Sequence, residues 1–372
     1  MIKLLSIVGA RPQFIKSFPV SLEIERANKK EKKINEILIH TGQHYDYNMS
    51  KIFFDQLGLK DPSYHLGVGS GSHSYQTGEM IKKIEEIIIK ERPDFVLVYG
   101  DTNSTLAGAI ATSKCNIPII HVESGLRSRN FKMPEEVNRV MTDRISSILF
   151  CPTNTAVENL NREGFNNFYY KGFKIEKPKI ILSGDVMYDS FLISSKETQP
   201  APIIKELVSS FNNYYLATIH RPENTDSKEI LSKLIYSLDK ISFETPIIMP
   251  IHPRTRDKLK QFDIKYSNLL LIDPVGYFDM IYLISKCKAI FTDSGGLQKE
   301  AFFGKKPCIT LRNETEWVEL VNLGYNTLVG SEPQKILEAE NKFINKSFKW
   351  KTELYGNGRA SEIIVKEISN FI

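Results

Sequence analysis

The sequence has few of the features that mark several common classes of protein. It contains 4 cysteines among 372 residues and no CxxC pair, so we expect reduced thiols in the packing rather than a disulfide framework or a metal site. No apolar run approaches the roughly 18 residues that a membrane span needs, and no signal peptide precedes the first strand pattern. These absences predict a cytoplasmic protein without a membrane partner.

The chain also lacks a large excess of either positive or negative charge. The chain has 49 Lys and Arg residues against 44 Asp and Glu, a net charge of +5, and no basic block with interleaved aromatic residues. We therefore predict no nucleic-acid partner, whereas the mild positive excess suits an anionic small molecule. A length of 372 residues with 41% hydrophobic residues predicts two domains, each with its own core.

Several cofactor and nucleophile signatures are missing as well. The sequence has no GxGxxG between a strand and a helix, no GxSxG elbow and no GK[ST] phosphate loop. His40 and His44 are four residues apart but lie across a strand end and a turn, not on one helix, so they lack metal-ligand spacing. We predict neither a cofactor nor a metal.

What the sequence does contain is an alternation of strands and helices. Short apolar runs end in small or polar residues and lead into helical patterns, which predicts parallel sheets covered on both faces. We predict an α/β fold of two Rossmann-like domains that face each other across a cleft: residues 1–178 plus the helix-like end 358–372, and residues 179–357. The predicted strands are 3–8, 34–41, 94–99, 118–122, 148–151, 214–219, 246–251, 269–272, 289–292 and 307–311.

The stretch AIFTDSGGLQKEAFFG (289–304) is where the other features converge. A strand that turns into a helix leaves free N–H groups at the helix N-terminus, where the dipole favours an anion. Glycine lets a phosphate approach the backbone closely, so Ser294, Gly295 and Gly296 are candidate phosphate ligands. Glu300, one or two turns into the helix, is placed to accept hydrogen bonds from a ribose. An ordinary turn capped by Ser294 is the alternative interpretation.

Polar groups follow six of the predicted strands, and open α/β sheets bind ligands beyond the carboxyl ends of their strands. Carboxylates close to cations suit proton transfer, because like charges raise some pKa values and cations lower others. His220 is a candidate acid–base group or phosphate partner because Arg221 follows it. The strand-end residues are Arg11, Asp101, Glu123, His220, Arg254 and Ser294, with Glu135 at a helix start.

A set of motifs in a fixed order resembles the non-hydrolysing UDP-N-acetylglucosamine 2-epimerase family, over nearly the whole chain. Any one of these motifs is unspecific, but the ordered set is specific. The motifs are GARPQFIK (9–16), TGQH (41–44), YGDTNSTLAGA (99–109), HVESGLRS (121–128), MPEEVNR (133–139), TIHRPENT (218–225), PIHPR (250–254), TDSGGLQKEA (292–301) and ETEW (314–317).

The resemblance implies a glycosyltransferase-B-like fold with UDP held mainly by the second domain. It implies inversion at C2 of a UDP-linked 2-acetamido sugar without NAD or metal, through elimination of UDP and its re-addition, and a homodimer. Asp101, Glu123 and Glu135 are then the acid–base candidates, with no choice among them as the base, and His220 lies by the phosphates. The implied substrate and UDP ligands are Arg11, Lys16, Arg221, His252, Arg254, Ser294, Gly295, Gly296, Glu300 and Arg312.

Two UDP-sugars are candidate substrates. Family members that use UDP-N-acetylglucosamine often read GTRPE, where this chain has Ala10 and Gln13. The spellings GARPQFIK and KMPEE resemble the branch that acts on UDP-2,3-diacetamido-2,3-dideoxy-glucuronate, whose C6 carboxylate needs a cation; Arg127, Arg129 and Lys132 are candidates. A hydrolysing 2-epimerase, a retaining glycosyltransferase of the same fold and a non-catalytic UDP-sugar sensor are the alternative functions.

Overall fold

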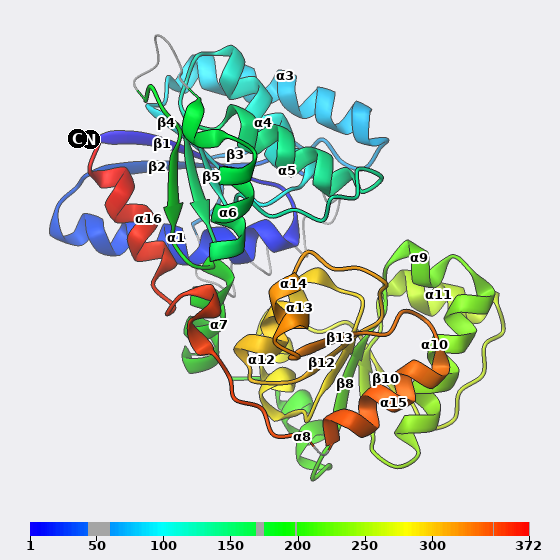
Figure 1. Ribbon diagram of the computed structural model, residues 1–372. Helices are drawn as coiled ribbons and strands as arrows, with labels where there is room; N and C mark the ends of the chain where they lie inside the picture. The colour runs from blue at the N-terminus through cyan, green and yellow to red at the C-terminus, as the bar shows by residue number, and fades with distance from the viewer. Residues whose placement is uncertain (44–59, 169–174, 198, 345, 372) are drawn as a thin grey trace. The chain divides into compact units, whose positions relative to one another are not determined.

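The computed structural model (Figure 1) describes residues 1–43, 60–168, 175–197, 199–344 and 346–371. His44, the last residue of the TGQH motif, lies outside the described residues. The chain divides into two compact units: unit 1 is Met1–Leu192 with Thr352–Ile372, and unit 2 is Ile193–Lys351. None of the helices described combines the length and the apolar character that crossing a membrane requires.

Unit 1 is built on a parallel sheet with the strand order β3-β2-β1-β4-β5-β6-β7. The central strands are mostly apolar and almost entirely buried, as expected where helices cover both faces; all five residues of β4 are buried. The strands are β1 (Ile2–Val8), β2 (Ile34–His40), β3 (Tyr64–His65), β4 (Phe95–Tyr99), β5 (Ile119–Val122), β6 (Ile148–Cys151) and β7 (Lys179–Leu182).

The helices of unit 1 form layers on the sheet. α3, α4 and α5 pack side by side, and α16, close to the C-terminus, packs along α1 (Figure 1). The helices are α1 (Arg11–Lys30), α3 (His73–Glu91), α4 (Asn103–Lys114), α5 (Pro134–Ile145), α6 (Asn154–Arg162) and α16 (Ala360–Ser369), with 3₁₀ turns η1 (Phe165–Asn167) and η2 (Thr352–Tyr355). The boundary between the units falls within α7 (Val186–Glu197), after Leu192.

Unit 2 repeats this architecture with a parallel sheet of order β10-β9-β8-β11-β12-β13. Its strands are β8 (Tyr215–Thr218), β9 (Ile247–Pro250), β10 (Leu270–Ile272), β11 (Ile290–Thr292), β12 (Cys308–Thr310) and β13 (Asn326–Leu328). Its helices are α8 (Pro202–Ser209), α9 (Pro222–Thr225), α10 (Lys228–Ser242), α11 (Pro253–Gln261), α12 (Tyr277–Lys286), α13 (Gly295–Phe303), α14 (Val318–Asn322) and α15 (Pro333–Ile344).

The predicted α/β architecture is confirmed. Each predicted strand is present, with its ends shifted by at most one residue. The strands that sequence reasoning missed, β3, β7 and β13, are all at sheet edges. Edge strands are covered less completely, so they do not need a continuous apolar run; β7, for example, is exposed or half-buried throughout.

The division into units differs from the predicted boundaries. Residue 178 was expected to end the first domain, but β7 pairs with β6 from Lys179 to Leu182 and therefore extends the sheet of unit 1. The chain remains in unit 1 until Leu192 and returns to it at Thr352, before the expected residue 358.

Gln13 joins the first helix to the sheet. Ala10, the residue before α1, has no side chain that can cap the helix, and the buried Gln13 amide takes over that role. Its Oε1 accepts hydrogen bonds from the N–H groups of Gly9 (2.8 Å) and Ala10 (3.1 Å). Its Nε2 donates to the Tyr99 carbonyl and to Thr105 Oγ1, both at 3.0 Å. This position uses both the acceptor and the donor of an amide, which explains Gln where GTRPE sequences have Glu.

We predict that Gln13→Glu destabilises unit 1. A carboxylate cannot donate to the Tyr99 carbonyl, and loss of such a buried partner costs about 1–3 kcal/mol. The urea midpoint of unfolding should fall, whereas Gln199→Glu, at an exposed position, should leave it unchanged. Equal midpoints for the two variants would show that the Gln13 donor contributes nothing.

Candidate active site

The carboxyl ends of three neighbouring strands place the predicted groups of unit 1 together. β4 lies between β1 and β5 in the sheet. Arg11 follows β1, Asp101 follows β4 and Glu123 follows β5, so parallel pairing brings their backbones to one edge. We call Arg11, Lys16, Asp101 and Glu123 the acid–base edge.

Lys16 and Glu123 form a buried ion pair at this edge. Their exposed fractions are only 6% and 7%, and a buried charge needs such a partner. Glu123 has φ +71°, a left-handed conformation that is rare for a residue with a side chain and that clusters at functional sites. The structure therefore holds the Glu123 carboxylate in one place at the cost of backbone strain.

Gly100 makes room for this ion pair. A Cβ at this position would lie 2.7 Å from Lys16 Nζ and 3.1 Å from Glu123 Oε2. Its φ of +64° is a second reason for glycine. The Gly100 N–H donates to the Val122 carbonyl at 2.9 Å, which connects the β4 and β5 ends.

Two residues of α5 hold Asp101 in place. Arg139 donates to its carboxylate at 2.6 Å, and Asn138 donates to its carbonyl at 2.9 Å. The Asp101 side chain stays 25% exposed, so it is accessible to a ligand. Arg139 is buried and brings a cation to a carboxylate that sequence reasoning placed among the acid–base candidates.

The two adjacent glutamates at the start of α5 have different environments. Glu136 is buried and accepts hydrogen bonds from the Ser128 N–H (2.9 Å) and the Arg129 N–H (2.8 Å), so it fixes the preceding loop. Glu135 is half-buried, and its carboxylate has no hydrogen-bond partner among the residues that the structure describes. Of this pair, Glu135 is the one available for chemistry.

In unit 2, Asp293 organises the residues after β8. It is fully buried and accepts hydrogen bonds from the N–H groups of His220 (3.0 Å) and Arg221 (2.9 Å) and from Asn224 Nδ2 (3.1 Å). Burial alone raises the pKa of Asp293, but the His220 side chain and the other donors outweigh it and hold the pKa below its ordinary value. The ionised carboxylate lies 3.2 Å from His220 Nδ1 and so orients the imidazole.

The predicted anion site lies at the N-terminus of α13. Ser294 caps this helix by accepting the Leu297 N–H, and Ser294, Gly295 and Gly296 are all partly exposed. A Cβ on Gly295 would lie 2.4 Å from Glu316 Oε1, so a larger residue here would displace that side chain. The N–H groups and dipole of a helix N-terminus attract anions.

Arg312, after β12, brings a cation to the same end of α13. It donates to Glu316 at 3.1 Å, and Glu316 lies against Gly295. Trp317 Nε1 donates to the Gly295 carbonyl at 3.0 Å, which fixes the ETEW segment on the first turn of α13. We call His220, Ser294, Gly295, Gly296 and Arg312 the anion edge.

The remaining predicted ligands of unit 2 lie around this edge or beside it. The ring centroids of His252 and His220 are 6.0 Å apart, and Glu300 is a buried member of α13. Arg221 Nη2 would lie 3.8 Å from a Cβ on Gly295. Arg254 contacts Asp226 at 2.6 Å, so this guanidinium already has a carboxylate partner.

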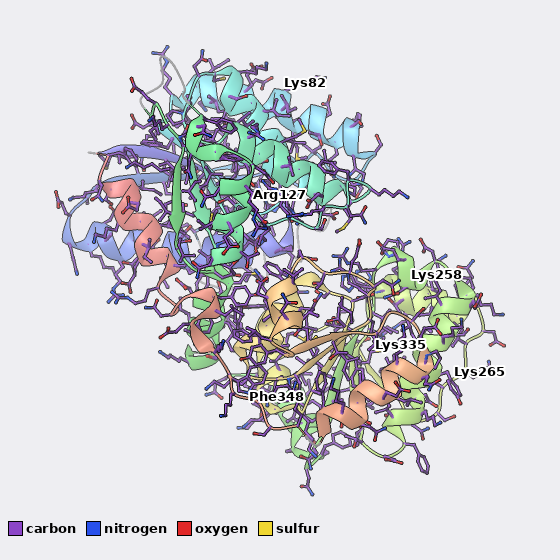
Figure 2. The ribbon with its side chains drawn as sticks, viewed as in Figure 1. Lys82, Arg127, Lys258, Lys265, Lys335 and Phe348 are labelled. Atoms are coloured by element: carbon purple, nitrogen blue, oxygen red, sulfur yellow. The ribbon has the colours of Figure 1, made fainter. Side chains whose placement is uncertain are left out.

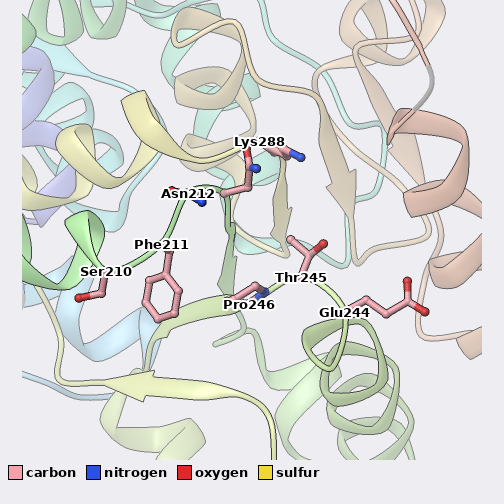
Figure 3. Close-up of a pocket in the computed structure, with 8 residues that line it drawn as sticks. Ser210, Phe211, Asn212, Glu244, Thr245, Pro246 and Lys288 are labelled. Atoms are coloured by element: carbon pink, nitrogen blue, oxygen red, sulfur yellow. The ribbon is translucent and has the colours of Figure 1, made fainter.

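An open hollow of about 290 Å³ lies at the opposite ends of the unit 2 strands (Figure 3). Lys288 and Pro246, in its wall, precede β11 and β9 rather than follow them. Because α/β sheets bind ligands at the carboxyl ends, we do not assign this hollow to the site. Among the described residues, no cluster of three or more His, Cys, Asp or Glu side chains is arranged to hold a metal ion.

Comparison with known proteins identifies the family. The family model described as UDP-N-acetylglucosamine 2-epimerase matches residues 26–369. The chain belongs to this family. A UDP-N-acetylglucosamine 2-epimerase homolog of Methanococcus maripaludis is 54% identical over 375 residues, covering 99% of both chains. The UDP-2,3-diacetamido-2,3-dideoxy-D-glucuronate 2-epimerase of Pseudomonas aeruginosa is 46% identical over 369 residues, again covering 99% of both chains.

A solved structure of the same family supports the fold. The crystal structure of the Methanocaldococcus jannaschii UDP-GlcNAc 2-epimerase in complex with UDP-GlcNAc and UDP is similar with a TM-score of 0.88 and 42% identity. The match covers 99% of this chain and 100% of the other. The family resemblance and the glycosyltransferase-B-like class of fold inferred from the sequence are confirmed.

Sequence reasoning missed three residues that hold the epimerase-family groups in place. Arg139 contacts Asp101, Asp293 contacts His220, and Gln13 caps α1. Arg139 lies 38 positions from Asp101 and Asp293 lies 73 from His220, so no local pattern connects them. Their presence inside the quoted motifs MPEEVNR, TDSGGLQKEA and GARPQFIK was the available signal.

We predict that Gly100→Ala impairs catalysis without abolishing UDP binding. The added methyl group would push Lys16 away from Glu123, so turnover should fall by about 10²-fold, the effect expected of a misplacement near 1 Å. Gly164→Ala is the matched control, because Gly164 also has a positive φ (+79°) but no atom within 4 Å of the added Cβ. Equal activity of the two variants would show that crowding of the Lys16–Glu123 pair does not affect turnover.

Proposed function

We propose that this protein is a non-hydrolysing UDP-sugar 2-epimerase, which inverts C2 of a UDP-linked 2-acetamido sugar. Its family and its full-length similarity to epimerases make it an isomerase that acts on UDP-sugars. The observation that carries the mechanism is the acid–base edge, where Glu123 is held by Lys16 in a strained conformation close to the loop of Asp101.

The proposed reaction is an elimination followed by an addition. A carboxylate removes the C2 proton, and the C–H electron pair forms a C1=C2 double bond while the C1–O bond to UDP breaks. The oxygen of UDP keeps the electron pair of that bond. UDP then adds back to C1 as a proton reaches C2 on the other face. Protons and electrons balance without an oxidant, so the mechanism invokes no nicotinamide.

The two edges divide this work. A carboxylate near a cation supports proton transfer, and Asp101, Glu123 and Glu135 are the proposed acid–base groups in unit 1. Departing UDP carries negative charge, which helix N–H groups and cations stabilise. We assign that role to the anion edge of unit 2, with His220 oriented by Asp293 and Glu300 proposed for the ribose.

The sugar has two candidates, UDP-N-acetylglucosamine and its 2,3-diacetamido-glucuronate analogue. The relative at 54% identity supports the first sugar and the relative at 46% identity supports the analogue. The C6 carboxylate of the analogue needs a cation. Arg127 (labelled in Figure 2) is not that cation, because Asp143 and Glu163 already engage it and its side chain is 4% exposed. Arg129 and Lys132 are exposed and remain the proposed partners. The expected homodimer and cytoplasmic location also remain proposals.

The first experiment is proton NMR in deuterated water with each of the two UDP-sugars. Because the C2 proton exchanges with solvent during elimination, we expect deuterium at C2 together with the C2-inverted UDP-sugar. Greater turnover of the diacetamido-glucuronate would identify it as the substrate. Free UDP and free sugar as the main products would point to a hydrolysing enzyme, and no exchange with either sugar would favour a transferase or a sensor.

We predict that Asp101→Asn, Glu123→Gln and Glu135→Gln each lower turnover by about 10²-fold or more, because each removes a general acid or base. UDP binding, measured by calorimetry, should persist. Glu158→Gln on α6 is the control, since the Glu158 side chain is 60% exposed and contacts only Arg162 among the described residues. A carboxylate variant with turnover like this control would leave the proposed acid–base set.

A further inference from the structure

A chain of polar side chains in contact with one another, most of them buried, begins next to the acid–base edge, at the Gly100 carbonyl. His121 on β5 contacts the Gly100 carbonyl through Nε2 and Asp143 Oδ1 through Nδ1, both at 2.7 Å. Asp143 Oδ2 accepts from Arg127 Nη1 at 2.7 Å, and Arg127 also donates to Glu163 at 2.7 and 2.8 Å. His121 and Asp143 are fully buried, and the chain reaches solvent only at Glu163, whose side chain is 31% exposed.

The partners of His121 determine its protons. A carbonyl oxygen only accepts, so Nε2 must carry a hydrogen to bond to Gly100. Asp143 Oδ2 accepts from the Gly125 N–H at 3.1 Å and from the Arg127 guanidinium, and contact with this cation favours the ionised carboxylate. Nδ1 must then also carry a hydrogen, and an imidazole with two N–H groups is a cation.

The surrounding charges agree with this assignment. Burial raises the pKa of Asp143, but its contacts with His121 and Arg127 outweigh burial and hold the pKa below its ordinary value. The neighbouring Cys151 adds no charge, because burial raises the pKa of its thiol to about 12. Cations and anions then alternate along this row of side chains, from His121 through Asp143 and Arg127 to Glu163. The row is neutral overall, and so is the adjacent Lys16–Glu123 pair.

His121 also fixes the peptide that leads into the acid–base edge. The N–H of Gly100 is bonded to Val122 and its carbonyl to His121, so the backbone that carries Asp101 is held on both sides. Gly100 is in turn the residue against which Lys16 and Glu123 pack. A shift of this peptide would move Asp101 and the ion pair together.

We propose that His121 is a buried imidazolium that positions Asp101 and the Lys16–Glu123 pair for proton transfer. This role rests on the proposed epimerase function, but the charge state of His121 does not. His121 is a positioning residue, because its partners are a backbone carbonyl and Asp143. Sequence reasoning did not single out His121, and the proposed charge is argued from its two contacts alone.

The first test is long-range ¹H–¹⁵N correlation NMR of the full-length ¹⁵N-labelled protein at neutral pH, where an ordinary histidine is mostly neutral. We expect both ring nitrogens of His121 to show the shifts of protonated imidazolium, with assignment by the missing signals of His121→Gln. One unprotonated ring nitrogen would overturn the proposal. This readout requires no turnover, so it is independent of whether the epimerase proposal holds.

The second test is the kinetics of His121→Gln. An amide side chain removes the charge, and we expect kcat to fall by about 10²-fold through misplacement of the acid–base groups, with KM and UDP affinity within about twofold of the parent. His65→Gln, an exposed histidine of the same unit, should change neither. An unchanged kcat for His121→Gln, or a loss of UDP binding and kcat in parallel with a lower melting temperature, would show a structural role only.

Discussion

Parallel pairing of strands is the constraint on which the rest of this structure depends. In a parallel sheet all carboxyl ends lie at the same edge, so polar residues that follow different strands become neighbours. β1, β4 and β5 bring Arg11, Asp101 and Glu123 to one edge of unit 1. β8, β11 and β12 do the same for His220, Ser294 and Arg312 in unit 2. The strand order of each sheet therefore determines which of these residues become neighbours.

Compensation of buried charge is the second physical theme. A buried ion without a partner is strongly unfavourable, so each buried charge here carries partners that fix its position. Lys16 balances Glu123, Arg139 contacts Asp101, and Asp143 and Asp293 each contact a histidine. In both units a buried aspartate contacts an imidazole: Asp143 of α5 contacts His121, and Asp293, after β11, contacts His220. The same contacts thus fix the side chains of the candidate site and compensate their buried charges.

Much of the fold could be predicted from sequence, because a parallel strand buried on both faces must be apolar and must end in a turn. The strands at sheet edges, such as β7, do not have to meet this condition, and the domain boundary was displaced for that reason. At the candidate site, the strand-end rule predicted Asp101, Glu123 and Ser294, and these residues follow β4, β5 and β11. It could not separate Glu135 from Glu136, because adjacent residues of one helix differ only in what packs against them.

By itself the sequence determined the family, the two α/β units and the polar residues at the strand ends, since these depend on local patterns and on the order of motifs. The tertiary structure alone decided which of those residues are held by partners and which are accessible. It paired Lys16 with Glu123 across 107 positions and Arg127 with Glu163 across 36. It also placed His121 at 2.7 Å from both Asp143 and the Gly100 carbonyl. Such contacts join segments that are distant in sequence, and only the packing of the sheet and its helices brings these segments within hydrogen-bonding distance.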